Sequence, residues 1–191
     1  DNDVRVTTLS RYPEVLTMEE QSVDEKELWE LLSEPLREAC TKFVEARTRE
    51  GQHLKEDLLS KLQELDRKVT LVEERSPQVV QAYRNKLEQK VHELLEDSQI
   101  DDNRIAAEVI LFSDKICNDE DTVRLHSHIH GMQKILLETE GIGRKMDFMA
   151  QEMNREANTI LSKSNDLEVS NLAIDLKTEI EKIREQIQNI E

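Results

Sequence analysis

The chain has 191 residues, of which 42 are acidic and 26 are basic, so its formal net charge is −16. Four glycines and three prolines are too few for a collagen-like chain, a low-complexity chain or an all-β sandwich. No apolar run reaches the length of a membrane span, and the acidic balance argues against the basic surface of an ordinary nucleic-acid-binding domain. We therefore expect one domain, or two small ones, with no membrane partner.

The first residues give the one strand-like pattern in the chain. Residues 4–18 alternate between apolar and polar side chains, and Pro13 interrupts the alternation. This pattern predicts a short extended lead-in that contains a turn. The chain opens at Asp1 without an initiator methionine or a targeting segment, so we expect a processed or truncated product.

From residue 24 onward the periodicity is helical. Asp24 followed by Glu27 predicts a helix start, and Pro35 predicts a kink or restart. Apolar residues then follow three- and four-residue spacing: Leu28, Leu31, Leu32, Leu36, Ala39, Cys40, Phe43 and Val44, followed by Leu54, Leu58, Leu62, Leu65, Val69 and Val72. The second set has the heptad spacing of a long helix with a narrow apolar seam. Gly51 weakens the connection between the two sets.

The remaining elements are also predicted to be helices. Ser76-Pro77 predicts a new helix start, and that helix fades at residues 96–97. Further helices are expected from residues 102, 119, 144 and 169, with Gly141–Gly143 as the clearest break. Their apolar faces are Ile105, Val109, Phe112 and Ile116; Leu125, Ile129, Met132 and Leu136; Met146, Met149, Met153, Ala157 and Ile160; and Val169, Leu172, Leu176, Ile180, Ile183, Ile187 and Ile190.

These elements predict an all-α protein whose several long helices form an elongated, coiled-coil-like bundle. We divide it into residues 1–100, the tail of an N-terminal region with a long helical arm, and residues 101–191, a C-terminal helical domain. Long helices with narrow seams and few aromatic residues bury little surface alone, so we expect a homo-oligomer. Cys40 and Cys117 are expected to be buried, inert thiols in a reducing cytoplasm.

Three histidines alternate at positions 126, 128 and 130. On a strand all three would share a face and could bind a metal. On the predicted helix His126 and His130 share a face, while His128 points elsewhere, four residues after Arg124. Exposed helix histidines without a role are the simpler interpretation. The sequence contains no His-Glu-x-x-His motif, P-loop, dinucleotide fingerprint or Gly-x-Ser-x-Gly elbow, which disfavours those chemistries.

Residues 147–164 form the densest polar block. At about 100° per residue, Glu152, Glu156 and Lys163 lie on one flank of the apolar stripe. Asp147, Asn154 and Asn158 lie on the opposite flank, with Arg155 pointing away from the core. The two glutamates repel each other unless a cation or proton lies between them, so they are candidate ligands for Mg²⁺ or Mn²⁺. An ordinary solvated helix face is the alternative.

Several motifs in the second half resemble the YicC/YloC family of bacterial proteins. They are the runs at 143–148 (GRKMDF), 151–159 (QEMNREANT), 162–164 (SKS) and 183–191 (IREQIQNIE). The resemblance continues upstream through Asn103-Arg104, Glu108, Asp114, Glu120-Asp121, Arg124-Leu125 and Ser127-His128. Leu161 stands where the family has a small residue, and Glu120-Asp121 where it has Glu-Glu. Residues 14–100 match more loosely.

The resemblance implies a metal-dependent endoribonuclease that acts on RNA in the cytoplasm as a homo-hexamer, with no DNA partner. It also implies that the chain is the C-terminal two-thirds of such a protein and lacks the N-terminal region. A non-catalytic helical scaffold or adaptor, in which the polar block would bind other subunits, is the alternative.

Site residues follow from positions that match the family pattern. The implied metal ligands are Glu108, Glu120, Glu152 and Glu156, binding Mn²⁺ or Mg²⁺, and the implied catalytic residues are His128, Glu152 and Glu156. The implied RNA-binding residues are Arg124, Arg144, Asn154, Arg155, Asn158 and Lys163. Because the net charge is acidic, RNA binding is expected to rely on a local basic strip, on bound metal, on assembly in the oligomer or on the absent region rather than on net charge.

Overall fold

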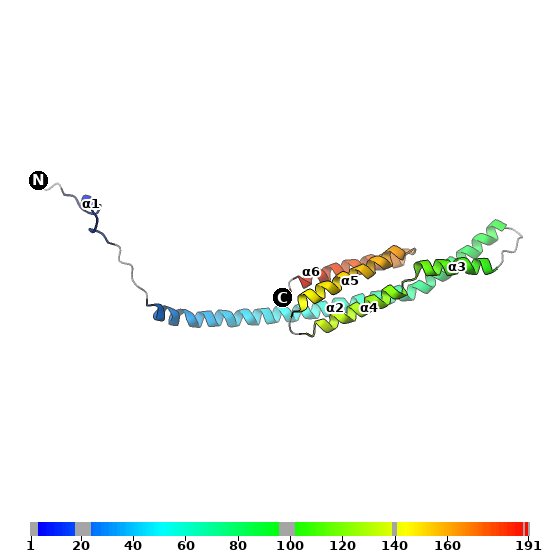
Figure 1. Cartoon of the computed structure of the whole chain (residues 1–191), viewed down its shortest axis with the longest axis horizontal. Helices are drawn as coiled ribbons and strands as arrows, with labels where there is room; N and C mark the ends of the chain where they lie inside the picture. The colour runs from blue at the N-terminus through cyan, green and yellow to red at the C-terminus, as the bar shows by residue number, and fades with distance from the viewer. Residues whose placement is uncertain (1–3, 18–23, 96–101, 139–140, 189, 191) are drawn as a thin grey trace. The chain divides into compact units, whose positions relative to one another are not determined.

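The computed structural model spans the chain and describes residues 4–17, 24–95, 102–138, 141–188 and 190, with the side chains of residues 94 and 95 left out. Six helices and no strand occur in this part of the chain, which confirms the all-α prediction (Figure 1). They are α1 (Val6–Leu9), α2 (Glu25–Leu95), α3 (Asp102–Ile116), α4 (Asp119–Ile135), α5 (Ile142–Lys163) and α6 (Leu167–Ile187). Among them is no helix with the length and apolar character needed to cross a membrane.

The chain divides into two compact units, Asp1–Thr48 and Arg49–Glu191. The sequence predicts a division between residues 100 and 101. This point falls within positions 96–101, which are outside the described residues, so the division stays a prediction. In the first unit the extended lead-in is short. Arg5 has an extended backbone, but residues 6–9 form one helical turn and further turns follow. The alternation in residues 4–18 therefore does not produce a strand in the described part of that segment.

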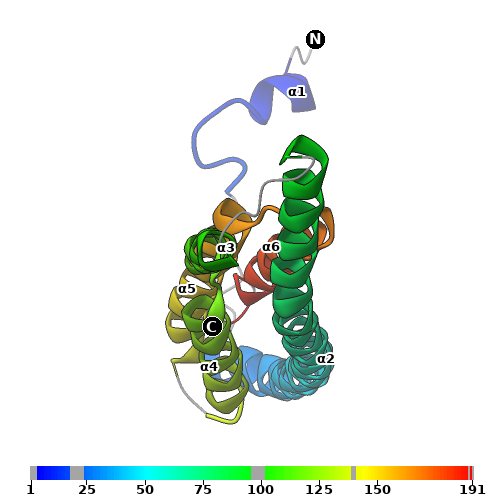
Figure 2. The same cartoon turned by 90° about the vertical axis from the view of Figure 1, so that its right-hand side faces the viewer.

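The second unit holds the hydrophobic core. Viewed along the helices in Figure 2, α6 lies between α2 and α5, and α4 lies across the core from α6. One apolar stripe from each helix fills this core, and the buried residues are Leu58, Leu62, Leu65, Val69, Val72 and Val79 of α2; Leu125, Ile129 and Met132 of α4; Met146, Ala150, Met153, Ala157 and Ile160 of α5; and Val169, Ala173, Leu176, Ile180, Ile183 and Ile187 of α6. These are the seams that three- and four-residue spacing predicts.

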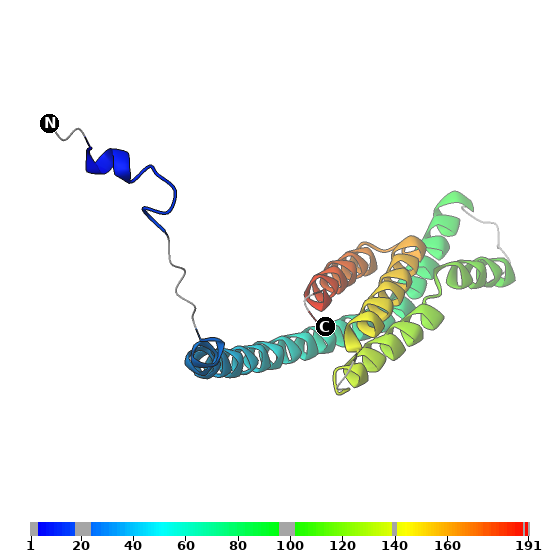
Figure 3. The same cartoon turned by 60° about the vertical axis from the view of Figure 1, so that its left-hand side comes forward.

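Helix α3 packs beside the last part of α2 (Figure 3). Its Phe112 ring stacks on Tyr83 of α2 with ring centroids 3.7 Å apart, and Ile116 joins the core. The predicted face of α3 is therefore the one that packs. The turn at Asn118, the N-cap residue of α4, then carries the chain into the core-forming helices.

Neither proline in α2 begins a new helix. Helix α2 continues through both Pro35 and Pro77, so the predicted new start at Ser76-Pro77 is wrong, and of the two outcomes predicted at Pro35 the restart is wrong. A proline within a helix removes one hydrogen bond, but the bonds on either side remain. In the second case the apolar seam also continues past the proline to Val79, so packing supports the helix there. The hydroxyl of Ser76 donates to the Val72 carbonyl instead of capping a new helix.

The beginnings of α2, α5 and α6 agree with capping residues and a glycine in the local sequence. Asp24 accepts from the backbone N–H of Lys26 at the start of α2. Gly141, at φ 63°, precedes α5 in the left-handed region that glycine tolerates. Asp166 caps α6 by accepting from the backbone N–H groups of Glu168 and Val169. Cys40 and Cys117 are free thiols as predicted, but both are exposed, so the prediction that they are buried is wrong.

Candidate functional site

Helix α5 places chemically different groups on its two flanks. One face is buried in the core, and the residues around it follow the predicted flanks. Glu156 and Lys163 contact α4, whereas Asp147 contacts α6. The prediction for Glu156 therefore needs one change, because its side chain is buried rather than beside the core.

The seam between α4 and α5 is lined by ion pairs. Lys163 Nζ lies 2.6 Å from Asp121 Oδ2 and also donates to the carbonyl of Cys117. One turn along α4, Arg124 pairs with the exposed Glu120 and reaches the buried Glu156 across the seam, at 3.9 Å from Nη1 to Oε1. A buried carboxylate needs such a cation, because an unpaired charge away from water is costly.

Helices α4 and α5 run antiparallel, and their register places His128 and Glu152 at the same level of the seam. Arg124 lies opposite Glu156, and further along the seam a Cβ on Gly131 would meet the Met149 side chain. His128 lies between those two levels on α4, and Glu152 lies between them on α5. Both side chains are half-buried. An imidazole and a carboxylate at one level of a solvent-accessible seam can serve as a proton acceptor and donor pair.

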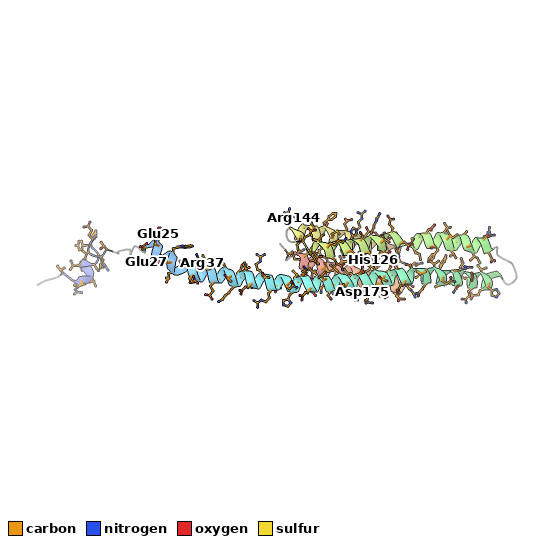
Figure 4. The ribbon with its side chains drawn as sticks, turned by 90° about the horizontal axis from the view of Figure 1, so that it is seen from below. Glu25, Glu27, Arg37, His126, Arg144 and Asp175 are labelled. Carbon is orange, nitrogen blue, oxygen red and sulfur yellow. The ribbon has the colours of Figure 1, made fainter. Side chains whose placement is uncertain are left out.

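The other two histidines share one face of α4, as the helical interpretation predicts, and this face contacts α2. His126 is labelled in Figure 4. His126 Nδ1 lies 2.6 Å from Asp66 Oδ1, and its Nε2 lies 3.6 Å from Glu73 Oε1. His130 Nε2 lies 3.7 Å from the same Asp66 oxygen. These contacts hold α4 against α2, so the two residues have a structural role that His128 does not share.

On the exposed side of α5 lies a shallow hollow of about 520 Å³, which we call the polar shelf. It is lined by Gln151, Asn154, Arg155, Asn158, Thr159, Ser162 and Arg184. None of these residues is acidic, although acidic residues outnumber basic ones in the chain 42 to 26. The shelf offers two guanidinium groups and the side-chain amides of Asn154 and Asn158, which are groups suited to phosphate oxygens. The hydroxyls of Thr159 and Ser162 donate to backbone carbonyls of α5.

Arg184 is the member of the shelf that the sequence analysis missed, together with Gln151, Thr159 and Ser162. It comes from α6, and its Nε lies 3.1 Å from Asp147 Oδ1 on α5. Gln151 donates to the other oxygen of Asp147. The signal that could have found Gln151 and Ser162 is their spacing, since they follow one exposed face of α5 with Arg155 and Asn158. The position of Arg184 in the shelf depends on how α6 packs against α5.

Two of the predicted residues, Glu108 and Arg144, lie away from the seam between α4 and α5. Glu108 is on α3, where the hydroxyl of Tyr83 donates to its carboxylate at 3.3 Å. Burial, with the neighbouring Glu108 charge, raises the pKa of the Tyr83 hydroxyl. Arg144 is exposed at the beginning of α5, roughly 28 Å along the helix axis from Lys163 at 1.5 Å per residue (Figure 4).

The four predicted metal ligands do not form one site within a single chain. Among the residues that the structure describes, no three histidine, cysteine or acidic side chains are arranged to hold a metal ion. Arg124 lies between Glu120 and Glu156, where a metal shared by these carboxylates would have to be, and Glu108 is bonded by Tyr83. The arrangement therefore does not fit a complete metal centre, and the metal assignment stays a prediction.

Comparison with known proteins identifies the class. The family model described as "Endoribonuclease YicC-like, C-terminal" matches residues 72–191, and the model described as "Endoribonuclease YicC-like, N-terminal region" matches residues 1–56. The chain belongs to the YicC-like endoribonuclease family. Part of the N-terminal region is therefore present in residues 1–56, and the prediction that this region is missing is wrong for that part.

Two curated relatives align over the whole chain. It is 43% identical to the "Probable endoribonuclease YicC" of Clostridioides difficile (strain 630) and 35% identical to the protein of the same description from Haemophilus influenzae. The chain spans 65% of the length of each relative.

Proposed function

We propose that this chain is the part of an endoribonuclease that binds RNA and carries groups for phosphodiester hydrolysis. The polar shelf is the observation that carries the proposal, because two arginines and no carboxylate line it on a strongly acidic chain. Arg155 is the main cation of the shelf, since Arg184 is paired with Asp147 and Glu181 beside it. The names of the two relatives support the same activity. RNA is the proposed partner and the cytoplasm the proposed location; DNA is not proposed as a substrate.

The chemistry is assigned to the chain's own residues. Arg155 and Arg184 bind phosphate oxygens of the RNA backbone, and Asn154 and Asn158 bond phosphate or sugar oxygens. His128 transfers a proton to or from the reacting oxygen, with Glu152 at the same level of the helical seam as its partner. Arg124 and Lys163 bind further phosphates when RNA reaches the seam between α4 and α5, and Arg144 does so at the beginning of α5.

Mn²⁺ or Mg²⁺ is the proposed cofactor, but no ligand set is assigned to it within one chain. Glu108, Glu120, Glu152 and Glu156 remain the candidate carboxylates, since hard oxygen ligands are those that these ions prefer. Among the described residues these carboxylates do not converge on one point.

Cleavage of a labelled RNA by the purified chain, with and without EDTA, tests the proposal. We expect cleavage that needs Mn²⁺ or Mg²⁺ and is lost in the double variant Glu152→Gln/Glu156→Gln. The matched control is Glu74→Gln, which neutralises an exposed carboxylate on α2. Because Glu156 is buried, thermal unfolding of each variant shows whether a loss of cleavage reflects a loss of fold. Cleavage by the folded double variant at the wild-type rate would contradict the assignment.

A non-catalytic oligomeric scaffold is the second candidate. The observation that favours it is the row of exposed apolar residues on residues 25–48 of α2, which includes Leu28, Leu32, Leu36 and Phe43. Under this function the protein assembles, with a hexamer as the expected size, and EDTA changes no RNA. Sedimentation equilibrium measures the assembly, and the cleavage assay separates the two functions.

A further inference from the structure

We infer that a hollow at the beginning of α5, built around Phe148, binds an unpaired RNA base while the polar shelf binds the neighbouring phosphates. This inference rests on the proposed RNA-binding function and adds the kind of RNA that is selected. The hollow has a volume of about 880 Å³ and is lined by Gly141, Gly143, Arg144, Asp147, Phe148, Gln151, Ile187, Gln188 and Ile190. No residue but Arg144 in this set is among the predicted site residues.

Phe148 is the one aromatic residue of the second unit whose ring is available to a ligand. The other two, Tyr83 and Phe112, stack on each other. Phe148 is 61% exposed, and among the described residues its ring has no stacking or cation–π partner. An exposed aromatic ring that lies among the apolar side chains of a hollow offers a flat face on which a nucleobase can stack.

The walls of the hollow suit the flat, partly polar shape of a nucleobase. Ile187 is buried and Ile190 is half-buried, so they provide an apolar floor. Arg144 and Gln151 are exposed polar residues on the rim. The Gln151 amide nitrogen donates to Asp147, and since an ionised carboxylate accepts only, the carbonyl oxygen of Gln151 faces away and can accept from a base edge.

The hollow is continuous with the polar shelf. Gln151 lines both, and the exposed residues Arg144, Phe148, Gln151 and Arg155 follow each other at intervals of four, three and four residues along one face of α5. A strand of RNA lying along this face would meet cations for its phosphates and an aromatic ring for a base. Stacking needs a base that is not paired in a duplex, so the arrangement selects single-stranded RNA.

Two ten-nucleotide probes separate the contribution of the base from that of the phosphates. One is a fluorescein-labelled adenosine RNA, and the other has the same sugar-phosphate backbone with no bases. Binding to the 191-residue chain is measured by fluorescence anisotropy in EDTA, and a gel confirms that the RNA stays intact. The variants are Phe148→Leu, which removes the ring, and Phe148→Trp, which keeps an aromatic face. Leu167→Ala, an exposed apolar residue at the start of α6, is the matched control.

We expect Phe148→Leu to weaken binding of the adenosine RNA about tenfold, the effect of roughly 1.4 kcal/mol of stacking. Binding of the abasic probe should be unchanged, Phe148→Trp should bind the RNA like the wild type, and Leu167→Ala should bind both probes normally. An equal loss for both probes, or no loss for either, would overturn the inference. So would a change in molecular mass on sedimentation, which would make Phe148 a contact between subunits.

Arg155→Ala distinguishes a failure of this inference from a failure of the proposed function. If it weakens binding of both probes while Phe148→Leu affects neither, the polar shelf binds RNA and the base site is wrong. If Arg155→Ala also has no effect, the shelf is not an RNA interface, and the base site that depends on it is wrong as well.

Discussion

Helix α2 contains two apolar stripes with similar spacing and opposite surroundings. In residues 49–95 the stripe from Leu58 to Val79 is buried in the core. In residues 25–48 the large apolar residues are exposed, including Trp29, Leu32 and Phe43. Three- and four-residue spacing predicts a helix in both places, but it does not say whether another element covers the face.

The two stretches of α2 also differ in the partners of their polar side chains. Residues 49–95 bond to other helices, since Asp57 accepts from Gln186, Arg75 binds Asp166, and Lys68 lies 3.5 Å from Asp175. Asp175 is labelled in Figure 4. In residues 25–48 the pair Lys42–Glu38 joins neighbouring turns of one helix. Glu25, Glu27 and Arg37, labelled in Figure 4, are exposed in this stretch. Contacts with other helices, rather than helix propensity, therefore distinguish the two stretches.

The largest effect is expected from shortening a leucine in each stripe. Leu62→Ala leaves a cavity in the core and should lower the free energy of unfolding by about 2–5 kcal/mol. Leu32→Ala, at a residue that is 50% exposed, should cost less than about 0.5 kcal/mol. Urea unfolding followed by circular dichroism measures both. An equal loss in the two variants would mean that the stripe of residues 25–48 is covered in solution.

Replacing the two prolines provides a second matched pair. Pro77→Ala restores a backbone donor within the packed stretch and should raise the free energy of unfolding by up to about 3 kcal/mol. Pro35→Ala should increase the helical signal without moving the main transition, because residues around it do not contribute to the core. If Pro77→Ala gives no gain, the neighbouring backbone is already adapted to proline.

The sequence predicted local features of the fold better than tertiary ones. The cap at Asp24, the helix start at residue 119 and the seam of α5 depend on residues within a few positions of one another, and the structure confirms them. The prolines gave the wrong answer because a local rule for helix ends takes no account of the long helix on both sides. Exposure of Cys40 could not be derived either, since its helical face has the same spacing as a buried one.

In the candidate site too, the sequence predicted local features better than those that depend on packing between helices. The flanks of α5 followed from 100° spacing, which placed Glu156 and Lys163 toward one neighbour and Asp147 toward the other. Arg184 could not be predicted as a member of the polar shelf, because the packing of α6 brings it there. Nor could spacing reveal that Arg124 pairs with both Glu120 and Glu156, which bears directly on whether those carboxylates can hold a metal.

A smaller effect is expected at two aspartates that cap helices. Asp166→Ala removes the cap of α6 and should lower the free energy of unfolding by about 0.5–2 kcal/mol. Asp24→Ala, which removes a cap from the exposed stretch of α2, should leave the main transition unchanged. Unfolding in urea at pH 7 measures both. A loss at Asp24 equal to that at Asp166 would show that residues 25–48 unfold together with the core.

Asp166 also gives the stability a dependence on pH. The hydrogen bond from Arg75 lowers the pKa of the Asp166 carboxyl, with further help from the backbone N–H groups of Glu168 and Val169. Its contribution is therefore complete above the ordinary aspartate pKa of about 3.9 and is lost as the pH falls through the lower folded-state pKa. Asp166→Asn should be less stable than the wild type at pH 7, and the difference should shrink below about pH 4. A difference that does not change with pH would contradict this role for the charge.

The smallest effect is expected at Gly51, near the boundary between the two stretches of α2. A Cβ there would meet no atom within 4 Å, so Gly51→Ala should stabilise the helix by about 0.4–1 kcal/mol through the unfolded chain. Gly143→Ala is the opposite control, because its Cβ would lie 2.6 Å from the Ile190 carbonyl oxygen. It should therefore destabilise the protein. Thermal unfolding compares the two variants. If Gly51→Ala gives no gain while Gly143→Ala behaves as expected, residue 51 is not held in a helix in solution, and the packed and exposed stripes belong to two helices joined at this glycine.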